Sequence, residues 1–220
     1  MLRSMVAGML SVLLVFGLIG LGVWAATNEP AAAPRSVART PASPAAPAET
    51  PTPSAEAVKP LPKVKRKSLA AAARAAGCTV SHPRDEGVEH ASQEFTAADY
   101  GTNPPTSGTH NPDWYEDGIY TSGTTPHLGM LVHALEHGRI EVQYAPGTDA
   151  ATVARLERLA DELEGGYHLL LFENGTEMPF AVAATAWGHL LGCPGMNDRV
   201  FDALRAFRNT YIDKGPEVVP

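Results

Sequence analysis

Cysteine is scarce in this chain of 220 residues, in which only Cys78 and Cys193 occur. Because no cysteine follows the apolar run near the N-terminus, a lipoprotein lipobox is excluded. No second thiol lies near Cys193 in the sequence, which argues against a copper site built from Cys193 and Met196. In an oxidising compartment the two cysteines could form a disulfide, but the sequence does not show whether they meet.

Basic residues are also few, with 17 Lys and Arg against 24 Asp and Glu and a formal net charge of −7 at pH 7. The densest basic cluster, Lys63–Lys67, precedes the globular part of the chain, which is therefore acidic. No basic stretch with interleaved aromatic residues occurs there. Nucleic acid is consequently not expected as a partner.

Charged residues are absent from Met5 to Ala26, a run long enough to cross the hydrocarbon core of a membrane. Arg3 precedes the run and Glu29 is the first charge after it, so the positive-inside rule places the N-terminus in the cytoplasm. The run is longer than the apolar core of a cleaved signal peptide. We therefore expect residues 1–28 to form a single-pass helix in the plasma membrane, with the C-terminal domain outside the cytoplasm.

Residues 29–67 are rich in proline and alanine. This composition cannot bury enough apolar surface to offset the entropy lost on ordering. It predicts a disordered tether with a basic end, which holds the following domain away from the membrane. The remaining residues, 68–220, have the length of one domain.

The domain is predicted to combine helices and strands. Residues 68–76 should form a short helix, and residues 79–120, rich in Gly, Pro, Asn, Asp and Thr, a long ordered loop with at most short strands. Polar and apolar residues alternate over residues 139–144, which predicts a strand with one buried face. Further elements are expected as a helix at 148–164, strands at 167–172 and 180–187 paired as a hairpin through Asn174-Gly175, and a helix from 197 or 198 to 214. The fold class is therefore α+β, with a small mixed sheet packed against helices.

The most informative motif is His-x-x-Glu-His, formed by His133, Glu136 and His137. At about 100° per residue these side chains share one side of a short helix, while Leu131 and Leu135 lie on the other. Two imidazoles four residues apart can direct nitrogen atoms toward one metal ion. The alternative is an amphipathic helix whose solvent-facing side contains histidine by chance.

A second segment, residues 103–112, presents a further histidine. Its prolines at positions 104, 105 and 112 fix backbone angles, so the loop loses little entropy when it holds His110 in place. The alternative is a proline-rich surface turn in which the histidine has no role.

These segments follow one another in a specific order: Pro104–Gly108, His110, Trp114, Gly118–Tyr120 and His133–Gly138. The order resembles that of a bacterial family catalogued as domain of unknown function 3105, over roughly Gly87 to Trp187. His90 falls where that family carries a histidine. The resemblance implies an envelope protein with one N-terminal membrane segment, and it implies no particular activity.

The first functional hypothesis is a metal-binding module for zinc or copper. Zinc suits imidazole and carboxylate ligands, whereas copper would be favoured if Met130 takes part. The outer nitrogens of the imidazoles would need partners, for which Asp113, Glu116 and Asp117 are candidates. The predicted metal ligands are the core pair His133 and His137 together with His110, Glu136 and His90.

Two alternatives remain open. In one, the histidines form a structural clasp that hydrogen-bonds the loop to the helix, in a non-catalytic domain that contacts an envelope protein. In the other, the protein is a zinc-dependent hydrolase, because His-x-x-Glu-His is the arrangement of inverted zinc proteases, in which the glutamate activates water. Gly138 directly after the motif and the lack of a long helix with a downstream carboxylate argue against the hydrolase.

Overall fold

The computed structural model describes residues 58–120 and 126–217. The predicted membrane helix and residues 29–57 of the predicted tether lie outside these ranges. None of the helices in the described part of the chain combines the length and the apolar character that a membrane crossing requires.

Six strands form one mixed sheet in the order β1-β6-β5-β3-β4-β2. β3 pairs in parallel with β4 and antiparallel with β5, and β2 extends the parallel side at the edge. The sheet and the helices around it confirm the predicted α+β class. The strands are β1 (Thr79–Ser81), β2 (Gly118–Tyr120), β3 (Ile140–Tyr144), β4 (Leu169–Glu173), β5 (Val182–Ala186) and β6 (His189–Cys193).

The four α-helices within residues 58–120 and 126–217 lie close to their predicted positions. Asp149 caps one of them, since its side chain accepts a hydrogen bond from the backbone N–H of Thr152. The long loop predicted before Tyr120 contains only β1, β2 and one short 3₁₀ helix at Ala97–Asp99. The helices are α1 (Leu69–Ala76), α2 (Leu128–Glu136), α3 (Ala150–Glu162) and α4 (Val200–Tyr211), and a second 3₁₀ helix covers Glu164–Gly166.

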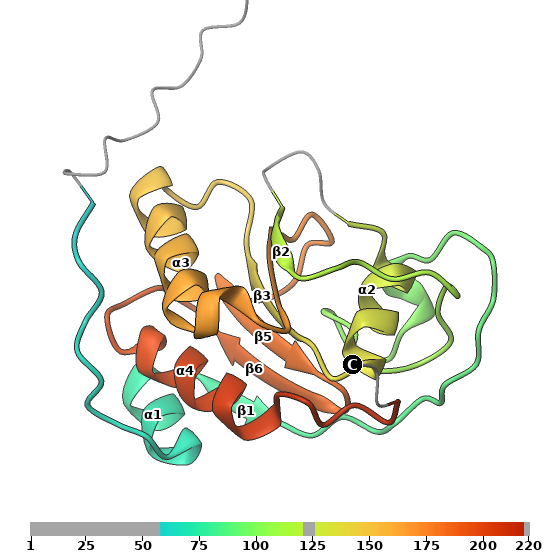
Figure 1. Ribbon diagram of the computed structural model, residues 1–220, viewed down its shortest axis with the longest axis horizontal. Coiled ribbons are helices and arrows are strands. Elements are labelled where there is room, and N and C mark those ends of the chain that lie inside the picture. The colour runs from blue at the N-terminus through green and yellow to red at the C-terminus, as the bar shows by residue number, and fades with distance from the viewer. Residues whose placement is uncertain (1–57, 121–125, 218–220) are drawn as a thin grey trace, which may run out of the picture. The chain divides into compact units, whose positions relative to one another are not determined.

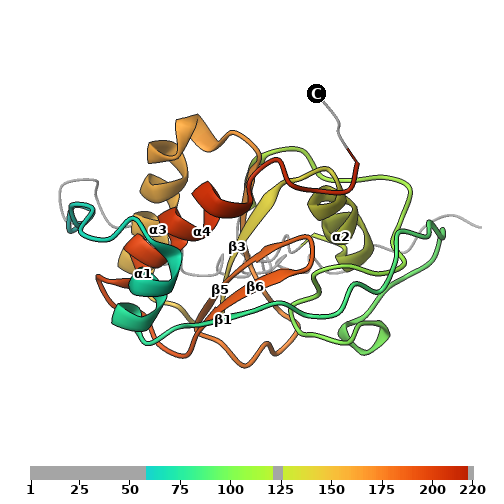
Figure 2. The ribbon, with the colours of Figure 1, turned by 90° about the horizontal axis from the view of Figure 1, so that it is seen from below.

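The helices are divided between the two faces of the sheet (Figures 1 and 2). α1, α3 and α4 cover one face, where Phe201 and Phe207 of α4 pack against Val142 of β3 and Leu171 of β4. α2 covers the other face together with the loop that precedes it, and its leucines contact Leu170 and Phe172 of β4. Side chains alternate across a strand, so neighbouring residues of β4 enter different cores.

The predicted hairpin between residues 167–172 and 180–187 is wrong, because β3 lies between these two strands. The Asn174-Gly175 turn instead starts a longer connection, and Asn174 is held against β3 by its side chain, which donates to Gln143 at 2.6 Å. The actual hairpin joins β5 to β6, a strand that the sequence interpretation missed, through Trp187 and Gly188. β3 is also buried along its whole length, whereas one buried face was predicted, because it occupies the middle of the sheet.

Cys78 and Cys193 form a disulfide across 115 residues of sequence. The bond joins the residue before β1 to the last residue of β6, next to the core beneath α1 and α4. The question that the sequence left open is thereby answered, and Cys193 carries no free thiolate for copper.

Residues 58–67, assigned by their composition to the end of the tether, lie against the domain. Asp202 of α4 accepts hydrogen bonds from the backbone N–H groups of Lys65 and Arg66. Val58 is buried and its carbonyl accepts from Arg158. The basic cluster thus includes backbone that is fixed to α4.

Candidate metal centre

α2 is held tightly at both ends, which fixes the direction of its polar side. Near its start, a Cβ on Gly129 would clash with the side chains of Asn111 and Phe95, so only glycine permits this approach of loop and helix. After its end, Gly138 has φ +82°, and a Cβ added there would lie only 2.9 Å from the backbone of Asp213. The segment that follows α4 therefore passes across the C-terminal end of α2, as the dark red chain in Figure 1 shows.

The loop before α2 places His110 in the interior. Its backbone N–H donates to Glu89, and its carbonyl accepts from Ala91, so that His90 and His110 pair side by side like residues of parallel strands. The His110 side chain is fully buried, whereas that of His90 is 42 % exposed. The alternative that this loop is a surface turn is therefore wrong, because the His110 side chain points into the molecule.

Four predicted ligands converge beside α2: His90, His110, His133 and Glu136. One carboxylate oxygen of Glu136 lies 2.9 Å from Nε2 of His110, 3.6 Å from Nε2 of His90 and 4.0 Å from Nε2 of His133. One ligand atom from each residue lies within 4.8 Å of all the others, a spacing at which the group could hold a metal ion. We call these four residues the inner group.

Hydrogen bonds at the far side of two rings fix which nitrogen is free. Nδ1 of His110 lies 2.7 Å from the carbonyl of Gly108, and Nδ1 of His133 lies 2.7 Å from the carbonyl of Asn111. A carbonyl only accepts, so both Nδ1 atoms must carry hydrogen, and in the neutral rings Nε2 bears a lone pair. Both lone pairs face Glu136. A histidine that binds a metal ion through Nε2 must be in this tautomer. The backbone supplies these partners, not Asp113, Glu116 or Asp117.

Burial keeps the imidazoles of α2 neutral. It lowers the pKa of His133, and the nearby His110 and His90 lower it further, against an opposing effect of the hydrogen bond to Asn111. It also lowers the pKa of His137, to about 4. Metal binding requires a neutral imidazole, and the lowered pKa values of both residues supply one at neutral pH.

His137 belongs to a second group, formed with His133 and Glu217. Its Nε2 lies 3.4 Å from the carboxylate of Glu217, and its Nδ1 lies 3.4 Å from a guanidinium nitrogen of Arg139. We call His133, His137 and Glu217 the outer group. The structure therefore does not place His137 with His90, His110 and Glu136, as the predicted core pair required.

Glu217 is a functional candidate that the sequence did not reveal. Its backbone N–H donates to the carbonyl of Glu136, which places its side chain beside the end of α2. Nothing in the spacing of Glu217 relates it to a motif 80 positions earlier in the chain. The one local signal was Gly138, since a glycine directly after the helix is typical of a close approach by another part of the backbone.

Other candidates lie elsewhere. Met130 and His127 border a separate hollow of about 220 Å³, together with Asp113. Glu116 and Asp117 bind the guanidinium of Arg139 at 3.2 and 2.8 Å. Met130 is therefore not placed to add a sulfur ligand to the inner group.

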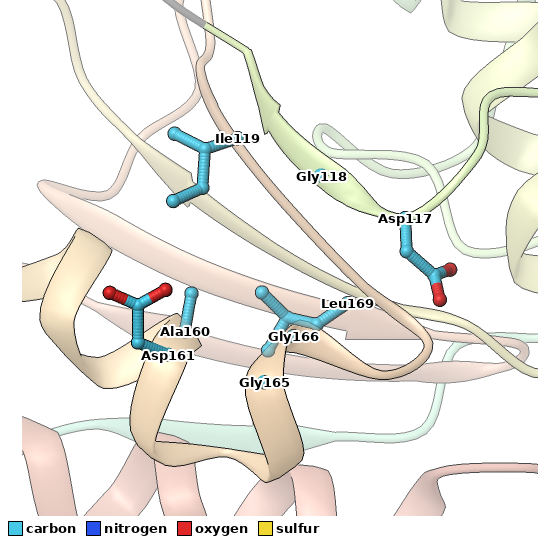
Figure 3. A pocket seen from close by; sticks show the side chains of 8 residues that line it. All are labelled: Asp117, Gly118, Ile119, Ala160, Asp161, Gly165, Gly166 and Leu169. Carbon is cyan, nitrogen blue, oxygen red and sulfur yellow. The ribbon is translucent and has the colours of Figure 1, made fainter.

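A further hollow of about 270 Å³ lies between β2 and the end of α3 (Figure 3). It contains two carboxylates, Asp117 and Asp161, which Figure 3 shows at opposite ends. Both oxygens of Asp117 already accept hydrogen bonds, from Arg139 and from the backbone of His168. No histidine lines this hollow, so its donor set does not compete with that of the inner group.

The chain belongs to the family described as protein of unknown function (DUF3105), whose model matches residues 90–219. The match includes the inner group and also α4 and Glu217. It therefore extends further toward the C-terminus than the resemblance noted from the sequence, which ended near Trp187. No curated protein and no solved structure matches the chain. The family has no established activity.

Proposed function

We propose that this protein binds one divalent transition-metal ion, zinc in preference to copper, through the inner group. The observation that carries the proposal is that Nδ1 of both His110 and His133 contacts a backbone carbonyl, while Nε2 of both faces the carboxylate of Glu136. Two acceptors 2.9 Å apart repel unless a cation lies between or beside them.

A proton on Nε2 of His110 would satisfy that contact alone and give the structural clasp. It leaves Nε2 of His133, which has no hydrogen to donate, facing the same carboxylate at 4.0 Å. A metal ion interacts with all three nitrogens and the carboxylate at once. The number of converging acceptors therefore favours a metal ion over a clasp.

The donor set favours zinc. Three imidazoles and one carboxylate suit the tetrahedral preference of Zn²⁺. Copper was favoured on the condition that Met130 supplies sulfur, and Met130 lies in another hollow. The hydrolase hypothesis also has less support, because Glu136 lies within the ligand group and would have to leave it to act as a base on water.

We further propose that residues 1–28 hold the protein in the plasma membrane and that the metal centre lies outside the cytoplasm. The disulfide between Cys78 and Cys193 supports this location, since such bonds persist in oxidising compartments. The tether would then set the distance between the membrane and the metal centre.

The test is the metal content of the full-length protein, purified in detergent without a histidine tag, stripped with chelator and offered zinc or copper. Elemental mass spectrometry should find one ion per chain. Glu136→Gln should weaken binding by about 10- to 100-fold or more, because it replaces a charged ligand by a neutral amide. His127→Gln is the matched control, since His127 is 65 % exposed and lies outside both groups.

Glu136→Gln also separates the metal site from the clasp. The amide of glutamine can donate to the free Nε2 of His110, so a clasp would survive the change with its stability intact. An unmutated protein that takes up no zinc or copper, and that Glu136→Gln does not destabilise, would overturn the metal proposal.

A further inference from the structure

The inner and outer groups share one residue, His133. Its Nδ1 is committed to the carbonyl of Asn111, which leaves only Nε2 for a metal ion. A single nitrogen lone pair binds one ion at a time. The two groups therefore are alternative positions for one ion, and not two independent sites.

The outer group borders the solvent through an open hollow and through Glu217, which is half exposed, although His133 and His137 are themselves buried. An open hollow of about 400 Å³ is lined by His137, Glu217 and Trp114, and also by His90 and His133 of the inner group. His110 and Glu136 do not line this hollow and are buried at 0 and 4 % exposure. An ion that reaches His110 and Glu136 from the hollow must therefore pass the outer group or His90.

The outer group should hold an ion more weakly than the inner group. Arg139 is always charged and donates toward Nδ1 of His137, which favours the tautomer with hydrogen on Nε2. That tautomer has to be lost when an ion binds there, and the guanidinium also repels a cation. In the inner group, by contrast, carbonyl partners hold His110 and His133 in the binding tautomer.

We propose that the outer group is the loading position of the metal centre, a role that rests on the proposed function. An ion from solvent first binds His133, His137 and Glu217. His133 then keeps its bond while the ion exchanges its other ligands, and any proton between His110 and Glu136 leaves to solvent. The exchange involves no change of oxidation state. Bonds to His137, Glu217 and one water molecule break as bonds form to His90, His110 and Glu136, and the water returns to solvent.

Two tryptophans can report the order of the steps. The ring of Trp114 lies 4.7 Å from that of His137, and the ring of Trp187 lies 6.0 Å from that of His110. Cu²⁺ is a suitable probe, because it quenches tryptophan at short range and accepts the same imidazole and carboxylate ligands as zinc. In full-length protein carrying Trp24→Phe, each reporter is observed alone after Trp187→Phe or Trp114→Phe. Stopped-flow mixing should quench Trp114 in a phase that depends on copper concentration, and Trp187 in a later phase that does not.

Glu217→Gln tests the role of the outer group by kinetics and equilibrium together. A loading position lowers the barrier in both directions, so its loss should slow uptake and release alike, by about tenfold. The equilibrium affinity and the stoichiometry of one ion should stay unchanged. Glu94→Gln is the matched control, because it removes a carboxylate that is 88 % exposed and belongs to neither group.

The outcomes are distinct. Faster release and weaker affinity in Glu217→Gln would make Glu217 a permanent ligand and overturn the loading role, as would unchanged rates in both directions. Simultaneous quenching of Trp114 and Trp187 would also overturn it. If the unmutated protein binds no metal at all, the proposed function itself fails, whatever the rates of the variants.

Discussion

The two faces of the sheet are built from different kinds of residue. On the face under α1, α3 and α4, the core is a large apolar cluster that includes Phe201, Phe207 and the disulfide-bonded Cys193. On the α2 face the apolar cluster is smaller, and beside it His110, Glu136 and Glu141 are buried although they are polar or charged. Residues of β3 contribute to both faces of the sheet. Val142 enters the large apolar cluster, and Glu141 points to the α2 face.

The difference indicates a division of work within one domain. Burying apolar side chains stabilises the fold, while burying ionisable groups costs free energy unless they are paired. On the α2 face, buried ionisable side chains lie where the inner group assembles, so the free-energy cost of burial arises there. We infer that the helical face supplies the stability that permits an arrangement of polar residues on the α2 face suited to binding.

The strongest disruption of the helical face should come from Phe201→Ala. Phe201 is fully buried, so its truncation leaves a cavity and should lower the free energy of unfolding by about 3–5 kcal/mol. Chemical denaturation measures this loss. Under native conditions the folded fraction should still bind metal with unchanged affinity, and a matching loss of affinity would contradict the division between the faces.

Removal of the disulfide should have the next largest effect. Replacing Cys78 and Cys193 together by alanine frees a loop of 115 residues in the unfolded chain, which should lower stability by about 2–4 kcal/mol. The shift of the denaturation midpoint from the oxidised unmutated protein to the double variant measures the loss, and reduction of the unmutated protein should give a similar shift. Equal stability of the oxidised protein and the double variant would show that the bond contributes nothing to the helical face.

A smaller effect, dependent on pH, is expected on the α2 face at Glu141. Burial raises the pKa of its carboxyl to about 8, against a lowering by the hydrogen bond from Thr185, and the oxygen Oε1 has no hydrogen-bond partner. The folded state thus binds this proton more tightly than the unfolded state. The contribution of this protonated carboxyl to the free energy of unfolding is therefore fully present below about pH 4.5. It is lost as the pH rises through about 8. Glu141→Gln should therefore raise the free energy of unfolding at pH 9, by about 1–3 kcal/mol, and change it little at pH 4.

Denaturation curves at both pH values check this prediction. Glu136→Gln is the comparison variant, since it changes the other buried glutamate of the α2 face. A stability gain that is the same at pH 4 and pH 9 would show that the charge of Glu141 is not its cause.

Much of the fold could be predicted because its signals are local. The apolar periodicity from Val153 to Leu163 and the cap at Asp149 specify α3 irrespective of the rest of the chain. The strand order could not be predicted in the same way. β3 inserts between β4 and β5 through hydrogen bonds between residues distant in sequence, and the short run His189–Cys193 gave no alternating pattern by which β6 could be recognised.

The candidate site divides in the same manner. The spacing of His133, Glu136 and His137 on a helix is a property of the sequence, and the stiff loop around His110 is another. Which of these residues face each other is decided by the position of the loop on α2, through contacts such as that of Asn111 with Gly129. The helix alone predicted His137 as a partner of His133, and packing separated it from the inner group.

The sequence by itself therefore determined the four described α-helices, the strands β3, β4 and β5, the α+β class and the identity of five candidate ligands. Only the tertiary structure decided the pairing of β3, the disulfide, the tautomers of His110 and His133, and the arrival of Glu217 beside His137. The reason is physical. Helix periodicity and turn chemistry act over a few residues, whereas strand order, burial and the hydrogen-bond partner of an imidazole depend on segments that only the folded chain brings together.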